Sequence, residues 1–323
     1  MSDIARIEAA AQRLHGHARR TPLLNAPLLD QIAGRKVFVK AECLQWTGSF
    51  KYRGGWSAVS ALRPEVRARG VIAYSSGNHA QGVALAARQH GVAAVIVMPR
   101  DAPQVKIANT RAYGAEVVLY DRATEDRDEI GAALSGQRGL TLIRPYDEPE
   151  VIAGQGTVGL EIAEQAAEAG IAEADVLICC GGGGLTSGIA LALASRAKNL
   201  RPRPVEPAGF DDVARSLATG RIQRNATLSG SVCDAIVTPQ PGAMTFPILQ
   251  RLSGPGLVVT DDQALHAMAL AFAHLRIVVE PGGAVALAAA LFLPDLPDTV
   301  ICTASGGNVD PEQFRQVLAR FPA

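Results

Sequence analysis

The chain of 323 residues lacks an excess of charge of either sign. Its 31 lysine and arginine residues balance 31 aspartate and glutamate residues, so the formal net charge is zero. Surfaces that bind nucleic acid or an anionic membrane usually carry a basic excess. The balance therefore argues against nucleic-acid and membrane partners, and it favours a small molecule as the substrate.

Long apolar runs and paired cysteine motifs are also missing. No stretch approaches the roughly 20 apolar residues of a membrane-spanning helix, and residues 1–6 lack the apolar core of a signal peptide. The cysteines show neither a C-x-x-C pair nor zinc-type spacing; they are Cys43, Cys179, Cys180, Cys233 and Cys302. Buried thiols in a reducing compartment account for them best, so we expect a cytoplasmic protein.

Lysine is scarce, since only five of the basic residues are lysines. One of them, Lys51, follows Gly48, Ser49 and Phe50 where a helix is expected to begin. A partly buried lysine amine can lose its proton and attack a carbonyl, which arginine cannot do. Lys51 is therefore a candidate Schiff-base nucleophile, although a solvated lysine in a first helical turn is the simpler interpretation when Lys51 is taken alone.

Short apolar runs alternate with helical segments along nearly the whole chain. In the first half we expect strands at 37–39, 71–74, 93–98, 116–120 and 140–143, and helices at 54–62, 80–90, 104–113 and 123–134. In the second half we expect helices at 157–169, 185–197, 262–275, 284–291 and 311–320, and strands at 175–180, 204–205, 257–259 and 299–303. This alternation predicts an α/β fold of open, mostly parallel sheets covered by helices.

Glycine-rich loops follow several of these strands, where parallel sheets bind ligands. In 75–79, free N–H groups at a helix start suit a carboxylate, although an ordinary N-cap by Ser76 or Asn78 is the simpler interpretation of that loop alone. In 181–184, four consecutive glycines before a helix favour a phosphate over a mere turn. The loop 303–308 offers a hydroxyl at a strand end, which can meet a heteroaromatic nitrogen, although an ordinary strand-to-helix turn is the simpler interpretation of that loop alone.

A nucleotide-binding motif is a weaker possibility. Gly154, Gly156 and Gly159 fit the pattern G-x-G-x-x-G, but the apolar run before them is short and follows 148–150, which is typical of a helix or loop start. The acidic residue expected at the end of the next strand is missing. We therefore reject the dinucleotide-binding interpretation of this motif, and a nicotinamide-dependent oxidoreductase stays only a remote alternative.

Together, the loops resemble those of pyridoxal-phosphate enzymes of the tryptophan-synthase-β fold, or fold type II. The chain is similar to the threonine/serine dehydratase and serine racemase family, with matching motifs in family order at 19–23, 48–51, 75–79, 151–157, 181–184, 280–281 and 305–308. The resemblance covers nearly the whole chain. It implies a large cofactor-binding domain of residues 1–69 and 148–323, a small mobile domain of residues 70–147 that closes over the substrate, and a homodimer.

The resemblance also implies roles for individual residues. Lys51 and Ser76 would be catalytic, and Lys51 would hold the cofactor, pyridoxal 5′-phosphate. Asn78 would meet the 3′ oxygen of the cofactor and Ser305 its pyridine nitrogen. The other cofactor-binding residues would be Phe50, Gly181, Gly182, Gly183, Gly184, Leu185 and Glu280, with the glycines at the phosphate. The substrate carboxylate would lie on Ser75, Ser76, Gly77 and His79.

A cation site is implied as well, with Glu206, the carbonyl of Phe210 and Asp212 as ligands. Oxygen ligands of this kind would suit Mg²⁺ or Ca²⁺. The alternative interpretation from sequence alone is that Asp211 and Asp212 cap the helix that begins there.

The implied activity is that of an ammonia-lyase, which would convert L-threonine, L-serine or both to a 2-oxo acid and ammonia by β-elimination. Lys51 would take the Cα proton, and the cofactor phosphate could protonate the leaving hydroxyl. A serine racemase or a 3-hydroxyaspartate dehydratase is the alternative within the family, and a non-catalytic pyridoxal-phosphate-binding protein is a remote one. Tyr146 stands where dehydratases tend to carry Phe and racemases Asn, which favours a dehydratase. Ala235 replaces the usual Gly near the substrate side chain and leaves the identity of that side chain open.

Overall fold

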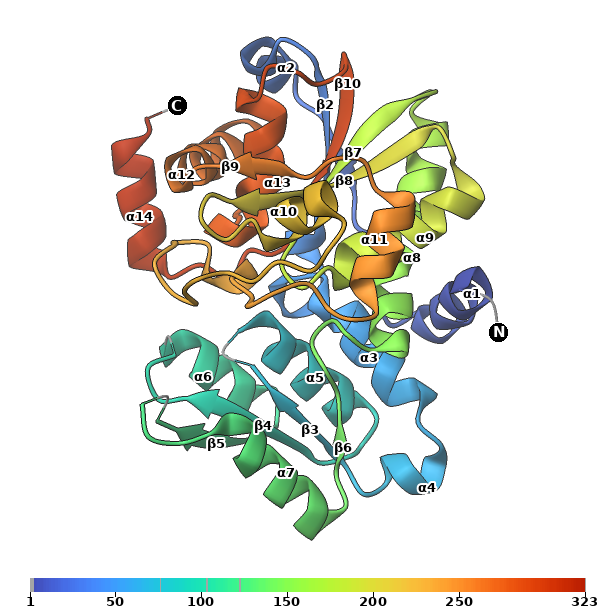
Figure 1. The fold of residues 1–323 in the computed structure, drawn as a ribbon, viewed down its shortest axis with the longest axis vertical. Helices are drawn as coiled ribbons and strands as arrows, with labels where there is room; N and C mark the ends of the chain where they lie inside the picture. The colour runs from blue at the N-terminus through green and yellow to red at the C-terminus, as the bar shows by residue number, and fades with distance from the viewer. Residues whose placement is uncertain (1–2, 76, 103, 122, 323) are drawn as a thin grey trace.

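Two mostly parallel sheets organise the chain in the computed structural model, which describes residues 3–75, 77–102, 104–121 and 123–322. The larger sheet has the order β1 (Leu23–Leu24), β2 (Lys36–Lys40), β10 (Thr299–Thr303), β7 (Ala174–Cys179), β8 (Leu200–Pro207) and β9 (Leu257–Val259), and β1 is antiparallel to β2. The smaller sheet has the order β5 (Glu116–Tyr120), β4 (Ala94–Pro99), β3 (Val71–Tyr74) and β6 (Thr141–Leu142), with parallel pairing throughout. Figure 1 shows the smaller sheet below the larger one. The predicted fold class is confirmed.

Helices cover both faces of the larger sheet because side chains alternate along its strands. In β7, Val176 and Ile178 pack against α8 (Pro149–Glu168) and α9 (Gly184–Arg196). Leu177 and Cys179 point to the opposite face, towards α13 (Pro281–Phe292). Because α13 is buried along almost its whole length, its sequence is apolar on all sides. The helices α2 (Pro27–Ala33), α12 (Asp261–Leu270) and α14 (Pro311–Arg320) lie on the same side as α13.

The smaller sheet is covered in the same way. On one face, Val71 and Ile96 share a core with α5 (Asn78–Gln89), α6 (Gln104–Ala112) and α3 (Lys51–Ala61). On the other face, Ile72 and Val95 pack against α7 (Arg127–Arg138). The remaining α-helices are α1 (Asp3–Leu14), α4 (Pro64–Arg67), α10 (Asp212–Thr219) and α11 (Thr245–Leu252). Within the described ranges, no helix has the length and apolar character needed to cross a bilayer.

Several expected boundaries were wrong, and the largest error concerns α8. This helix begins at Pro149 rather than at residue 157, so the G-x-G-x-x-G motif lies inside a helix. A Cβ added to Gly154 would lie 2.5 Å from the Arg53 carbonyl oxygen, and one added to Gly159 would lie 2.9 Å from the Ile189 Cα. These glycines therefore serve close helix packing, and the rejection of a nucleotide loop is confirmed.

Other boundaries shift for local reasons. The helix α7 begins at Arg127 because the Asp126 side chain accepts the N–H groups of Asp128 and Glu129. The segment expected as one helix from 262 to 275 ends its α-helical part at Leu270 and continues as a π-helix, Ala271–Leu275. The π-helix stops at Arg276, which adopts φ 59°.

A matched pair of glycine substitutions tests this packing. A Cβ on Gly188 of α9 would lie 2.5 Å from both the Gly156 nitrogen and the Ile152 oxygen of α8, whereas one on the exposed Gly136 of α7 would meet nothing within 4 Å. We expect Gly188→Ala to lower the free energy of unfolding by about 1–3 kcal/mol through overpacking. Gly136→Ala should raise it by about 0.5–1 kcal/mol. Denaturant unfolding measures both, and equal effects would contradict the assigned helix contact.

Candidate active site

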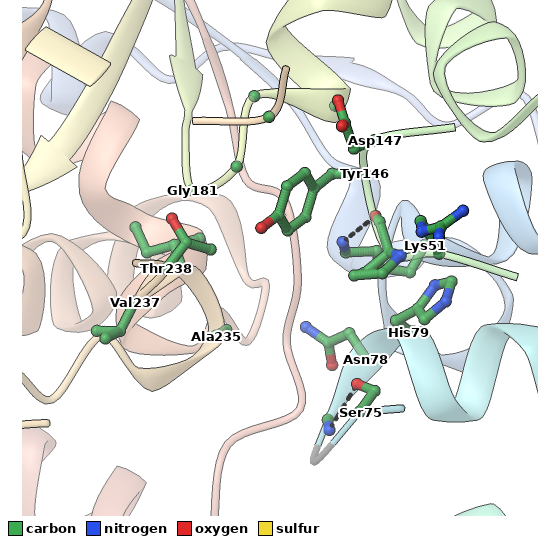
Figure 2. A pocket seen from close by; sticks show the side chains of 18 of the residues that line it. Lys51, Ser75, Asn78, His79, Tyr146, Asp147, Gly181, Ala235, Val237 and Thr238 are labelled. Atoms are coloured by element: carbon green, nitrogen blue, oxygen red, sulfur yellow. Dashed lines mark hydrogen bonds between the residues drawn. The ribbon is translucent and has the colours of Figure 1, made fainter. Parts of the chain in front are cut away.

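A cavity of about 850 Å³ opens where strands of both sheets end. Its lining comes from the loop after β3, the glycine loop between β7 and α9, and the segment that follows β6. Figure 2 shows Lys51, Asn78, His79 and Tyr146 around this space, with Gly181 and Ala235 across from them. Among the residues predicted for the site, the cavity is lined by Phe50, Lys51, Ser75, Gly77, Asn78, His79, Gly181, Gly182, Gly183, Gly184, Leu185, Glu280 and Ser305. Ser76 lies outside the described residues.

Lys51 is the first residue of α3, and its amine faces the cavity. Nζ donates a hydrogen bond of 2.9 Å to the carbonyl oxygen of Pro145. The loss of water around this amine lowers the pKa of Lys51 to about 8. An appreciable fraction of the amine is therefore neutral near pH 7, as a nucleophile or a base requires.

A buried ion cluster of Lys40, Glu42, Arg53 and Glu161 holds the start of α3. Arg53 donates to both carboxylate oxygens of Glu42 at 2.8 Å, and to those of Glu161 at 2.7 and 2.9 Å. Lys40 donates to Glu161 at 2.5 Å. Arg53 lies two residues after Lys51 in the same helix and has 1% exposure. Because these bonds hold Arg53 in place, they also fix the position from which the Lys51 side chain extends.

The loop after β3 leads into α5 and offers polar groups for a carboxylate. The Gly77 N–H donates to the Ser75 hydroxyl at 3.2 Å. His79 is buried, and its Nε2 lies 2.9 Å from the Ile143 carbonyl oxygen, so this nitrogen carries the hydrogen. Burial, followed by the charge of Lys51, lowers the pKa of His79 to about 3. The ring is therefore neutral, and its Nδ1 is a buried acceptor without a hydrogen-bond partner among the described residues.

Asn78 is held from two sides. Its amide nitrogen donates to Glu280 at 2.5 Å, and its amide oxygen accepts from Asn308 at 2.8 Å. Glu280 is buried, and this burial raises its pKa while the nearby Lys106 lowers it. Through these contacts the start of α5 is fixed against the large sheet at the cavity wall.

The glycine loop after β7 suits an anion. Gly183 adopts φ 91°, a left-handed conformation that glycine tolerates, and α9 then begins at Gly184 without a side-chain cap. The first N–H groups of α9 are thus left for another acceptor. A Cβ on Gly181 would lie 2.9 Å from the Ile236 carbonyl oxygen, so a residue with a side chain would not fit at this position. These features match the phosphate of pyridoxal phosphate.

The loop after β10 is joined directly to the loop of Lys51. The Phe50 N–H donates to the Ser305 carbonyl oxygen at 3.1 Å, and Ser49 forms a bridge with Gly306. Ser305 is 4% exposed and lines the cavity. Amine, hydroxyl, amide and glycine loop thus surround one space, and they fit a phosphorylated heteroaromatic aldehyde.

Glu206 lies near the end of β8, Phe210 lies in the turn that follows, and Asp212 begins α10. Glu206 accepts the N–H groups of Val213 at 3.0 Å and Ala214 at 2.7 Å, so Glu206 caps α10. The alternative that Asp211 and Asp212 cap this helix is wrong, because Asp211 makes no side-chain cap. The Asp212 Oδ2 atom is buried and has no hydrogen-bond partner in the described part of the chain.

The electrostatics of the Glu206 and Asp212 carboxyl groups favour a cation beside them. Burial, followed by the charge of Asp212, raises the pKa of Glu206 well above its usual range, and burial raises the pKa of Asp212 to about 6. Within the described ranges, no group of three or more His, Cys, Asp or Glu side chains is placed to hold a metal. The predicted set has two carboxylates and a carbonyl, and the orphaned Asp212 oxygen fits a cation there.

Sequence reasoning missed how residues 143–147, here called the crossing segment, span the cavity. The Ile143 carbonyl meets His79, the Pro145 carbonyl meets Lys51, and the Asp147 carboxylate accepts N–H groups of Met244 at 2.8 Å and Ala243 at 3.2 Å. Lys106 was missed as well: it is 5% exposed and lies 3.0 Å from Asp234. The scarcity of lysine was the one signal that pointed to Lys106.

Comparison with known proteins agrees with this geometry. The model of the family described as pyridoxal-phosphate dependent enzyme matches residues 14–307. An L-threo-3-hydroxyaspartate ammonia-lyase of Pseudomonas sp is 44% identical over 96% of both chains. A serine racemase of Schizosaccharomyces pombe is 38% identical over 97% of this chain and 96% of its own. Among solved structures, a threonine deaminase of T.th. has a TM-score of 0.89 at 45% identity, covering 95% of this chain and 98% of that one.

The lowered pKa of Lys51 can be measured without the cofactor. In competitive acylation of the cofactor-free protein, read by mass spectrometry, the Lys51 amine should gain reactivity through a midpoint near pH 8. An ordinary lysine amine titrates at 10.5. A midpoint near 10.5 for Lys51 would show that the amine is solvated and would contradict the site as described.

Proposed function

The chain belongs to the family of pyridoxal-phosphate-dependent enzymes, and on this premise we propose that it is an ammonia-lyase that converts L-threonine, L-serine or both to a 2-oxo acid and ammonia. The observation that carries the proposal is Lys51, whose amine has a pKa lowered to about 8 and faces a cavity lined by the carboxylate and glycine loops. Relatives named as ammonia-lyases and a threonine deaminase support the reaction class.

Pyridoxal phosphate, when bound, would draw electrons from the substrate and make its Cα proton removable. The N–H groups of 181–184 and of the start of α9 would hold its phosphate, and Phe50 and Leu185 would contact the cofactor. Asn78 would lie at its 3′ oxygen, in a position set by Glu280, and Ser305 at its pyridine nitrogen. Ser75, Gly77 and neutral His79 would orient the substrate carboxylate, and the amine of Lys51 would take the Cα proton. Ser76 remains a predicted member of this group.

A second candidate substrate is 3-hydroxyaspartate, which carries an additional carboxylate. Arg127 and Arg144 line the cavity, and neither forms an ion pair with a described residue. Such arginines can meet a second carboxylate directly. The relative from Pseudomonas sp is named for this substrate. Serine racemase is the other alternative, and relatives of that name support it equally.

A substrate panel and one pair of variants test the proposal. The wild type should release ammonia and 2-oxo acid from at least one of L-serine, L-threonine and L-threo-3-hydroxyaspartate, and a chiral assay of L-serine should show little D-serine. Lys51→Ala should lower kcat by about 10³-fold or more, because it removes the base. Lys36→Ala, at a lysine with 67% side-chain exposure, is the control and should leave kcat unchanged. Racemisation without ammonia release would contradict the lyase, and ammonia release by Lys51→Ala would contradict the role of Lys51.

We also propose that Glu206, the Phe210 carbonyl and Asp212 bind Mg²⁺ or Ca²⁺, supported by the buried Asp212 Oδ2 atom that lacks a partner. At a cation concentration of about 100 times Kd, binding should raise the free energy of unfolding by about 2.7 kcal/mol, and a chelator should reverse this. Asp212→Asn should lose the response in thermal unfolding. Asp211→Asn should keep it, because Asp211 pairs with Arg215 at 3.3 Å. An equal response in wild type and Asp212→Asn would place the cation elsewhere.

A further inference from the structure

We propose that Tyr146 is a further catalytic residue, whose phenol gives its proton to the β-hydroxyl group as that group leaves the substrate. The inference rests on the proposed ammonia-lyase function and deepens it, because β-elimination of a hydroxyl needs an acid. Three observations support it: the position of Tyr146 is fixed, its ring lies on the glycine loop, and its hydroxyl is free in the cavity.

The backbone on both sides of Tyr146 is tied to the site. On one side, the Pro145 carbonyl oxygen accepts the hydrogen bond of 2.9 Å from the Lys51 amine. On the other side, the Asp147 carboxylate accepts the N–H groups of Met244 and Ala243. Tyr146 is therefore placed by the same contacts that place the predicted base, and its distance from that base is restrained.

The ring of Tyr146 also leaves no room for side chains on the glycine loop. A Cβ on Gly182 would overlap the ring, and a Cβ on Gly184 would lie 2.9 Å from the Tyr146 Cβ. Two of the four consecutive glycines are thus needed for this contact as well as for an anion. The phenol is thus held beside the glycine loop that is expected to bind the phosphate.

The hydroxyl of Tyr146 points into the cavity. In Figure 2 its oxygen lies on the side of Thr238 and Ala235, and Lys51 and Asn78 lie across the ring from it. No described residue forms a hydrogen bond with this oxygen. Burial, followed by the charge of Asp147, raises the pKa of Tyr146 above its usual value of 10.0. The phenol is therefore protonated at any working pH and can act as a donor.

The proton count closes without an external reactant. The Lys51 amine takes the proton from Cα, a Cα–Cβ double bond forms, and the Cβ–O bond breaks. The Tyr146 proton passes to the departing oxygen, which leaves as water. Because Lys51 lies across the ring from the hydroxyl (Figure 2), the Lys51 ammonium releases its proton to solvent and the phenolate takes one from solvent, so both side chains return to their starting states.

A leaving group that needs no proton separates this role from a structural one. The holoenzymes of wild type and Tyr146→Phe are compared on their best β-hydroxy amino acid and on β-chloro-L-alanine, which loses chloride. Tyr146→Phe keeps the ring on Gly182 and removes only the hydroxyl. We expect kcat for the β-hydroxy substrate to fall by about 10²-fold, while kcat for β-chloro-L-alanine stays close to that of wild type.

Tyr74→Phe provides the control, because Tyr74 lines the same cavity but its ring lies against Gly131 of α7. It should change neither rate. Loss of both rates to the same extent in Tyr146→Phe would assign Tyr146 a structural role. Full activity on the β-hydroxy substrate would favour the cofactor phosphate as the acid. A wild type that eliminates no β-hydroxyl group would overturn the proposed function itself, and that outcome is visible before any variant is made.

Discussion

The candidate site depends on one buried arrangement of charges, in which Arg53 lies between Glu42 and Glu161. Desolvating these ions costs several kcal/mol each, and the cost is offset only where every donor and acceptor has a partner. Arg53 meets this condition, because further bonds to the Thr157 hydroxyl at 3.2 Å and the Arg19 carbonyl at 3.0 Å complete its contacts. A lysine offers no planar fork and could not join both carboxylates in this way. The cluster thereby connects the start of α3 with α8 and with the residues that follow β2, and these contacts fix the position of Lys51.

Glycine has two different structural roles around this cluster. On α3, α8 and α9 it lets helices approach: a Cβ on Gly54 would overlap the Gln155 amide, and one on Gly156 would lie 3.0 Å from the Gly188 oxygen. At 181–184 it leaves N–H groups uncapped at the start of a helix. A nucleotide-type glycine spacing and a glycine loop proposed to hold a phosphate thus occur in one chain, and only the second stands between a strand and a helix. The context of a glycine, more than its spacing, decides which role it has.

This difference explains how far the sequence could be interpreted. The fold class, the order of most strands and helices, Lys51 and the loops at 75–79, 181–184 and 303–308 could be predicted, because each rests on local periodicity or on a strand followed by glycines. Strand β8 was predicted only at 204–205, whereas it runs from Leu200 to Pro207 and contains Pro202 and Pro204, which are disfavoured inside a strand. The two prolines are tolerated because β9 pairs with β8 only from Val205 onward, and on that side the backbone of Pro202 faces Gly254 instead of a strand. The crossing segment could not be predicted, because its contact with Lys51 joins residues 94 positions apart.

Burial also gives Lys51 and Tyr146 complementary chemistry. It lowers the pKa of the Lys51 amine to about 8 and raises that of the Tyr146 phenol above 10.0, so the same exclusion of water leaves one group able to accept a proton and the other able to donate one. The order of the transfers follows from these directions. A departing hydroxide is a far stronger base than a phenolate, because water has a pKa of about 15.7, so proton transfer from Tyr146 runs downhill. The phenolate is in turn a stronger base than the Lys51 amine, so the net transfer of a proton through solvent from the Lys51 ammonium to the phenolate is favourable as well.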